Sequence, residues 1–132
     1  MPSYRYLPGR TPRHECDCVS FVLASGYVTH SVLRHDPLFL YSLDLVNEGF
    51  FWEAHECLEI LWRRESGNSI ADNIKALIQL CAAALKTVVG PPSAVTRLID
   101  RAENSANENF ESDLGVSFCA ISGVIKSGLP PL

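Results

Sequence analysis

From residue 36 onward, apolar side chains recur every three or four positions, the spacing that places them on one face of an α-helix. Asp36 followed by Pro37 is typical of a helix start, with a capping carboxylate and a proline at the first helical position. Gly49 is expected to end this first helix. The same periodicity predicts three further helices, over residues 51–64, 70–88 and from Ser93 to about residue 106.

The boundaries of the later helices follow from capping residues and prolines. Ser69, with Asp72 three residues later, resembles a capping box for the third helix. Gly90-Pro91-Pro92 is expected to end that helix, since proline cannot continue the hydrogen-bond ladder. Residues 104–113 are polar and are expected to fray, whereas residues 116–125 are predicted to form a short closing helix.

The predicted fold is therefore all-α: a compact antiparallel bundle of four to five helices with an irregular N-terminal segment. Residues 1–20 show turn residues without periodicity, and residues 19–34 suit a short strand or a helix equally well. We expect residues 1–35 to pack on a helical core domain at 36–110, followed by a short helix and tail at 111–132.

Composition narrows the class of partner. The chain has 132 residues, 47% of them hydrophobic, and a formal net charge of −4. An acidic balance argues against nucleic acid or an anionic membrane as the main partner, because both attract basic surfaces. No run approaches the roughly 18 apolar residues of a membrane span, and no apolar stretch follows the first basic residue, so we expect a cytoplasmic protein.

The five cysteines are scattered and odd in number, which favours reduced thiols. Cys57 and Cys81 fall within apolar helical patterns and are expected to behave as small hydrophobic residues. The group His14-Glu15-Cys16-Asp17-Cys18 has the side chains to hold zinc or copper(I). Its two cysteines are closer together than in a zinc knuckle and no second pair completes the ligand set, so a solvated turn is the favoured interpretation.

The predicted helix at 51–64 carries the most chemistry. At about 100° per residue its side chains divide into two arcs. The core-facing arc is predicted to hold Phe51, Ala54, Leu58, Leu61 and Trp62. The arc beside it, at the edge of the core, is predicted to hold Trp52, His55, Glu56, Glu59 and Arg63. Imidazole and carboxylate groups at such a boundary are half-desolvated, which is typical of functional sites.

Three interpretations of this polar arc remain open. In the first, His55 and Glu59 ligate a divalent metal and Glu56 acts as general base, as in helical H-E-x-x-H sites. A third ligand would then come from Asp44, Glu48, Asp72 or an N-terminal histidine. In the second, the histidine and glutamate do acid–base chemistry without a metal. In the third, which spacing alone favours, Glu59 pairs with Arg63 and His55 hydrogen-bonds a neighbouring helix.

The run from Tyr41 to Glu56, with Leu58-Glu59 and Trp62-Arg63 after it, resembles the signature of the domain-of-unknown-function family 309. Residues 77–84 and 97–99 also resemble that family, and Tyr4 to Pro12 is similar to its N-terminal element. The chain departs from the family at residues 13–35. The resemblance implies a small all-helical fold and brings no established activity. The residues that match its motif are Asn47, Gly49, Glu53, Ala54, His55, Glu56, Glu59, Trp62 and Gln79.

Two functions compete. The first is a ligand-binding or protein-interaction module that takes a small molecule, a protein or a second copy of the chain. Its predicted binding residues are Asn47, Glu53, His55, Glu59, Trp62, Arg63 and Gln79. The second is a metal-dependent hydrolase with His55 and Glu59 as ligands and Glu56 as base. Gln79 lies on the polar side of its predicted helix, beside Lys75, which argues against its facing His55.

Overall fold

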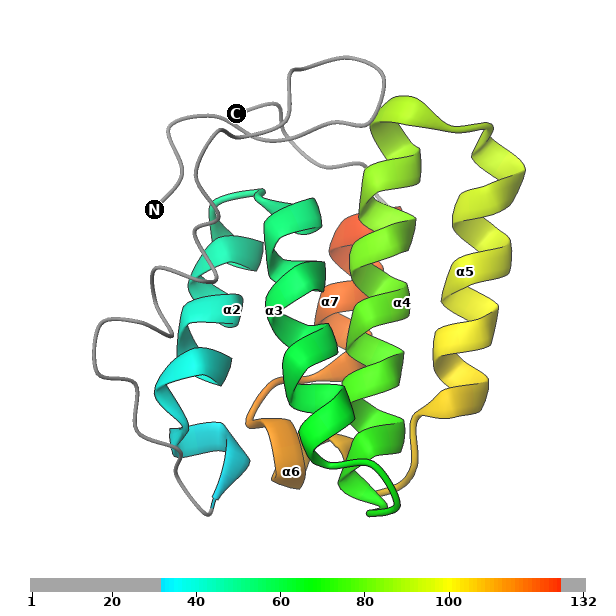
Figure 1. The fold of residues 1–132 in the computed structure, drawn as a ribbon. Coiled ribbons are helices and arrows are strands. Elements are labelled where there is room, and N and C mark those ends of the chain that lie inside the picture. The colour runs from blue at the N-terminus through cyan, green and yellow to red at the C-terminus, as the bar shows by residue number, and fades with distance from the viewer. Residues whose placement is uncertain (1–31, 127–132) are drawn as a thin grey trace.

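A computed structural model describes residues 32–126, and every regular element among them is a helix (Figure 1). The all-α prediction is confirmed. The elements are the short 3-10 helix η1 (Leu33–His35) and the α-helices α2 (Pro37–Asn47), α3 (Phe51–Arg64), α4 (Ile70–Val89), α5 (Pro92–Ser105), α6 (Phe110–Leu114) and α7 (Phe118–Lys126).

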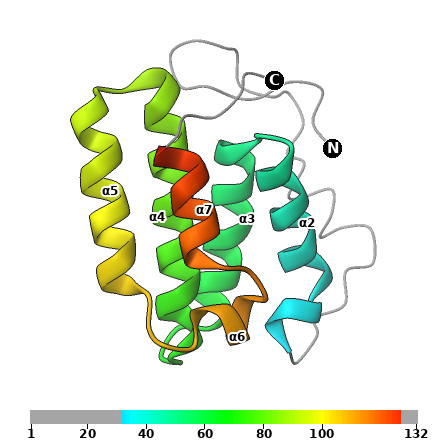
Figure 2. The same cartoon turned by 180° about the vertical axis from the view of Figure 1, so that it is seen from behind.

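Two antiparallel hairpins, α2–α3 and α4–α5, make up most of the bundle (Figure 1). The longest helix, α4, lies between α3 and α5 and packs against both. Seen from behind, α7 crosses the other face of α4, between α3 and α5 (Figure 2). The short helix α6 closes the lower end and contacts α4 and η1.

The first three helix starts agree closely with the sequence. Asp36 caps α2 as expected, and its carboxylate accepts the backbone N–H of Leu38 at 2.9 Å. Gly49 follows the helix with a φ of 82°, a conformation that a side chain at this position would strain. Helix α3 spans 51–64 as predicted, and α4 runs one residue beyond the predicted end.

Three local predictions were wrong. Ser69 makes no capping hydrogen bond, because its backbone is already helical and a capping side chain requires an extended one. Helix α5 begins at Pro92 rather than Ser93, with the proline in the first turn, where its missing N–H costs nothing. The polar residues 104–113 do not fray: they contain the end of α5, a hydrogen-bonded turn and the start of α6.

The core centres on α4. Its side chains Ile74, Leu77 and Leu80 are fully buried, as are the smaller Ala76, Ala83 and Ala84. Side chains from α2, α3, α5, α6 and α7 complete one continuous hydrophobic cluster around them. Each alanine leaves room for a neighbouring helix to approach, while the larger residues fill the space between helices.

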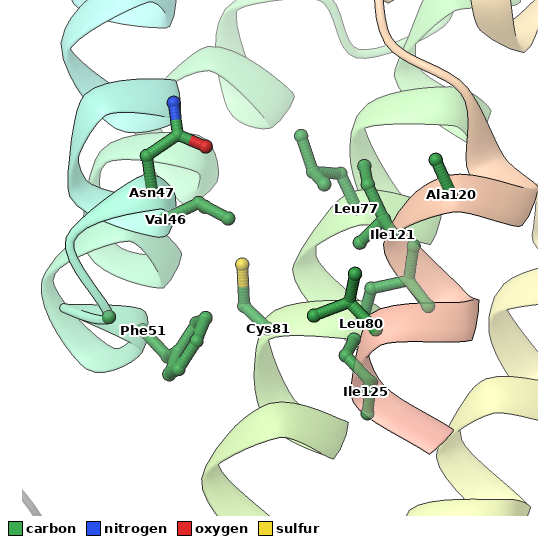
Figure 3. A pocket seen from close by; sticks show the side chains of 11 residues that line it. Val46, Asn47, Phe51, Leu77, Leu80, Cys81, Ala120, Ile121 and Ile125 are labelled. Carbon is green, nitrogen blue, oxygen red and sulfur yellow. The ribbon is translucent and has the colours of Figure 1, made fainter. Parts of the chain in front are cut away.

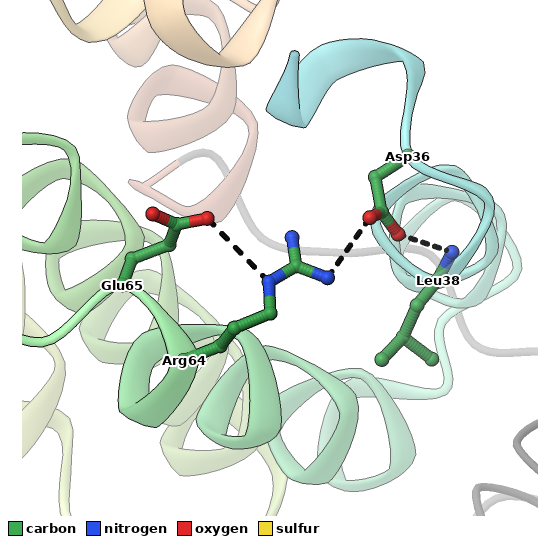
Figure 4. Close-up of polar contacts among 4 residues, drawn as sticks. All are labelled: Asp36, Leu38, Arg64 and Glu65. Carbon is green, nitrogen blue, oxygen red and sulfur yellow. Dashed lines mark hydrogen bonds and ion pairs between the residues drawn. The ribbon is translucent and has the colours of Figure 1, made fainter. Parts of the chain in front are cut away.

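A buried ion pair joins the start of α2 to the end of α3 (Figure 4). The Asp36 carboxylate is fully buried, and Arg64 Nη1 donates to its Oδ2 at 2.9 Å. The Arg64 Nε lies 3.4 Å from Glu65 Oε1. A buried carboxylate is costly unless it is paired, so this contact fixes the two ends of the hairpin against each other.

A second polar cluster ties the α5–α6 turn to the start of α4. Asn73 is fully buried, and its Nδ2 donates to Asn107 Oδ1 and Asp113 Oδ2, each at 2.9 Å. Its Oδ1 accepts the backbone N–H of Asn107, also at 2.9 Å. We call these three residues the Asn73 cluster. The buried side-chain amide of Asn73 thus satisfies hydrogen-bonding groups of a turn that lies more than 30 residues later in the chain.

None of the helices within residues 32–126 has the length and apolar character needed to cross a membrane. The His14–Cys18 group, the open assignment of residues 19–31 and the irregular segment 1–20 lie outside the described residues. The division into a core domain and flanking segments stays a prediction.

Replacing Arg64 with leucine is expected to lower the free energy of unfolding by about 2–3 kcal/mol, because Asp36 then keeps a buried charge without its guanidinium. Urea denaturation measures the change. Arg63→Leu is the matched control: its side chain is 70% exposed, and we expect a loss below about 0.5 kcal/mol. Equal losses in the two variants would contradict the role given to the buried pair.

Replacing Asn73 with leucine, a residue of similar volume, is expected to cost about 1–3 kcal/mol by leaving polar groups of the turn unsatisfied. Hydrogen exchange should also show faster exchange of the Asn107 amide, which loses its acceptor. Asn104→Leu, at an exposed position of α5, serves as the control. Unchanged protection of Asn107 in the Asn73 variant would contradict the assignment.

Candidate functional site

Four side chains on successive turns of α3 form what we call the α3 row: Trp52, His55, Glu59 and Arg63. The rings of Trp52 and His55 are tilted by 31° with their centroids 5.5 Å apart. His55 Nε2 lies 3.2 Å from Glu59 Oε1, and Arg63 Nη2 lies 3.5 Å from Glu59 Oε2. The predicted Glu59–Arg63 pair is therefore confirmed, and these three contacts join residues of one helix.

The α3 row becomes more exposed toward the end of the helix. The side chain of His55 is 23% exposed, that of Glu59 38% and that of Arg63 70%. Ion pairs at such exposure are screened by solvent and contribute little to stability. The half-buried position predicted for His55 and Glu59 is confirmed, whereas Arg63 lies in solvent.

The predicted arcs of α3 need one correction. Trp62 was expected in the core but is 40% exposed, while Glu53 and Cys57 are buried. Because α3 packs against both α2 and α4, its buried surface is turned toward Glu53 and Cys57. The α3 row therefore begins at the edge of the core, where Trp52 packs against it and His55 is half-buried, and reaches solvent only at Arg63.

The two other glutamates of α3 lie in different surroundings. Glu53 is only 3% exposed and belongs to the first turn of the helix, where the helix dipole stabilises a carboxylate. Glu56 is half-buried. Because Glu53 is buried, a partner in solution has little access to its carboxylate. The half-buried Glu56 is more accessible to such a partner.

Among residues 32–126, His55 does not make the predicted hydrogen bond to a neighbouring helix. Its Nδ1 is buried and has no hydrogen-bond partner in this range, while its Nε2 faces Glu59 of the same helix.

A metal site at His55 and Glu59 needs at least one further ligand. Within the described part of the chain, no three histidine, cysteine, aspartate or glutamate side chains come close enough to hold a metal ion. Asp44, Glu48 and Asp72 therefore do not complete a site with His55 and Glu59. The metal-dependent chemistry assigned to Glu56 stays a prediction.

Gln79, the remaining predicted binding residue on α4, contacts α5. The hydroxyl of Ser105 donates to Gln79 Oε1 at 2.9 Å. This hydrogen bond helps hold the α4–α5 hairpin together. The structure therefore gives Gln79 a partner on α5, in keeping with its predicted place on the polar side of α4.

The clearest hollow in the described part of the chain lies between the α2–α3 turn, α4 and α7 (Figure 3). We call it the α2–α7 cavity. Its volume is about 370 Å³, and its lining residues are Val46, Asn47, Gly49, Phe51, Leu77, Leu80, Cys81, Ala120, Ile121, Val124 and Ile125. Pockets of this size and apolar character are typical of small-molecule sites. The predicted site residue Asn47 stands at its exposed edge.

The Cys81 sulfur points from α4 into the space toward Val46 and Phe51 (Figure 3). The residue is 2% exposed, and burial raises the pKa of its thiol to about 12. At neutral pH the thiol is therefore uncharged. It contributes a soft, nearly apolar wall rather than a nucleophile.

The sequence arguments missed this cavity because they treated each helix separately. Cys81 follows Leu77 at a helical spacing, and Ile125 follows Ile121 in the same way on α7. These spacings marked the residues as core-facing, which is correct. The hollow between these residues arises from the way the lining helices pack against one another. The spacing of residues within one helix does not predict such an arrangement.

Comparison with known proteins gives one result. Residues 39–98, which run from α2 into α5, match the model of the family described as Domain of unknown function (DUF309). The matched range holds the turn at Gly49, the whole α3 row and Gln79. No curated protein and no solved structure matches the chain.

The α3 row should behave as a set of surface contacts. In a double-mutant cycle of Glu59→Ala and Arg63→Ala, we expect a coupling of about 0.5 kcal/mol or less, because the pair is screened by water. Urea denaturation at low and at 1 M salt measures it, and the coupling should vanish at high salt. A coupling above about 2 kcal/mol would instead indicate a desolvated network.

Proposed function

We propose that this protein, whose residues 39–98 match the model of the DUF309 family, is a binding module that holds a small apolar molecule in the α2–α7 cavity. The observation that carries this proposal is the cavity itself: about 370 Å³ of space lined by side chains of four helices. The hollow is partly open to solvent, so a small molecule can reach it while the helices stay folded.

The cavity also contains residues that the sequence singled out for other reasons. Asn47 and Gly49 belong to the family motif, and both line the cavity. Gly49 sets the tight turn that places the end of α2 and the start of α3 on one side of the space. The motif residues Asn47 and Gly49 thus form one wall of the cavity, at the α2–α3 turn.

The α3 row is a less suitable primary site. The ion pairs of His55, Glu59 and Arg63 join residues of one helix, and these side chains become steadily more exposed toward Arg63. A small molecule on such a surface would remain largely hydrated, whereas the α2–α7 cavity removes apolar surface from water. The cavity is therefore the better candidate for the binding function.

We expect the neutral fluorescent probe N-phenyl-1-naphthylamine to bind the full chain at one saturable site with increased fluorescence. Ala120→Phe, at an exposed lining position of α7, should fill the mouth and weaken binding by at least about tenfold. Cys119→Phe, the adjacent exposed position outside the lining, is the matched control and should bind as the wild type does.

Circular dichroism of both variants checks that the helices are retained. Probe binding that is absent in the wild-type chain would contradict the proposed function. Binding that Ala120→Phe and Cys119→Phe affect equally would place the probe elsewhere on the protein.

A further inference from the structure

We propose that a second hollow, where the ends of α4 and α7 meet the start of α5, binds the phosphate group of a small phosphate monoester. We call it the lysine hollow. Its volume is about 340 Å³, and its lining residues are Lys86, Thr87, Gly90, Pro92, Val95, Thr96, Ile99, Ile125 and Lys126. It lies on the α5 side of α7, whereas the α2–α7 cavity lies on the side of α2 and α3 (Figure 2). The proposal does not rest on the binding function assigned to that cavity.

Two of the three lysines in the whole chain line this hollow. Lys86 belongs to the last turn of α4 and Lys126 to the last turn of α7. The helix dipole favours a lysine in the last turn, which accounts for one on each helix but not for their meeting at one hollow. Because the protein carries a formal net charge of −4, it repels anions overall. A site for an anion must therefore gather positive charge locally, as these two ammonium groups do.

The stem of Lys86 lies directly over Gly90. A Cβ atom on Gly90 would collide with the Cδ of Lys86 and lie 3.3 Å from its Cβ and Cγ. The backbone of Gly90 is extended, with a φ of −125°, so its conformation does not require a glycine. The glycine instead leaves room for the Lys86 side chain. A half-buried stem held in this way loses less conformational entropy when its ammonium group binds a ligand.

The rest of the lining indicates which anion fits. Thr96 on α5 is exposed and has a hydroxyl that can donate a hydrogen bond. Two ammonium groups and a hydroxyl suit the phosphate of a monoester, which carries nearly two negative charges at pH 7. Beside them, an apolar wall for the organic part of the ester is formed by Val95, Ile99 and Ile125.

The test is a titration of the full chain with phenyl phosphate at pH 7, followed through the backbone amide signals in two-dimensional NMR spectra. Phenyl phosphate should shift the amide signals of Thr87, Gly90 and Thr96 to saturation. It should bind more tightly than inorganic phosphate, because its ring removes part of the apolar wall from water.

The lysines are tested by charge-removing variants. Lys86→Gln and Lys126→Gln should each weaken the binding of phenyl phosphate by at least about fivefold, because each removes one charge-assisted contact. Lys75→Gln, at an exposed position of α4 outside the lining, changes the net charge equally. This control should bind as the wild type does.

Gly90→Ala tests the seating of Lys86 without changing any charge. The added methyl group displaces the lysine stem, so the affinity for phenyl phosphate should fall by about two- to fivefold. Gly123→Ala is the matched control, since a Cβ atom there meets nothing within 4 Å among the described residues. Circular dichroism checks that each variant retains its helices.

Each alternative outcome overturns a stated part of the proposal. Absence of saturable shifts, or shifts confined to amides away from the lysine hollow, overturns the site. So does an equal loss of affinity in Lys75→Gln and in the two lining variants, which would indicate only a general attraction between charges. Inorganic phosphate binding as tightly as phenyl phosphate overturns the ester as the ligand class. Full affinity in Gly90→Ala overturns the positioning role given to Gly90.

Discussion

The fold depends on the need to cover α4. Buried side chains occupy most of the circumference of this 20-residue helix, including the polar Asn73 near its start. A helix with so much apolar surface is stable only when enclosed, and no single partner can enclose it. The protein covers it in pieces: α3 and α5 on the two flanks, α7 across the remaining face and α6 at one end.

When several separate helices cover one central helix, spaces remain where the covering helices come together. The α2–α7 cavity is such a space, between the α2–α3 turn and α7 where both lie against α4 near Cys81. At other places along α4 the buried Ala76, Ala83 and Ala84 allow neighbouring helices to approach closely. The cavity is therefore a product of the same architecture that stabilises the bundle.

The helices could be predicted because their signals are local. Asp36, Gly49 and the spacing of apolar residues act within a few positions, and the ends of α2 and α3 follow from them. The orientation of each helix could not be predicted in the same way. Trp62 is exposed and Glu53 is buried because α3 has two neighbours, and the hydrophobic pattern of one helix does not record where both of them lie.

The long-range polar contacts could not be predicted from the sequence for a related reason. Asp36 was recognised as a cap, but its pairing with Arg64 requires the hairpin to close. Asn73 could not be singled out from the sequence, because its partners Asn107 and Asp113 lie more than 30 residues away. Of the candidate site, the sequence predicted Asn47 as a binding residue, Gly49 as the turn between two helices and Glu59–Arg63 as a pair. The walls from α4 and α7 appear only in three dimensions.

The Asn73 cluster has a consequence for the order of folding. Its hydrogen bonds join residues 34 and 40 positions apart, so they form only after the intervening chain has looped back. The first turn of α4 must exist before the segment from Asn107 onward has a place to dock. The position of α6, and of the α7 wall that follows it, is thus set by a contact between segments distant in sequence.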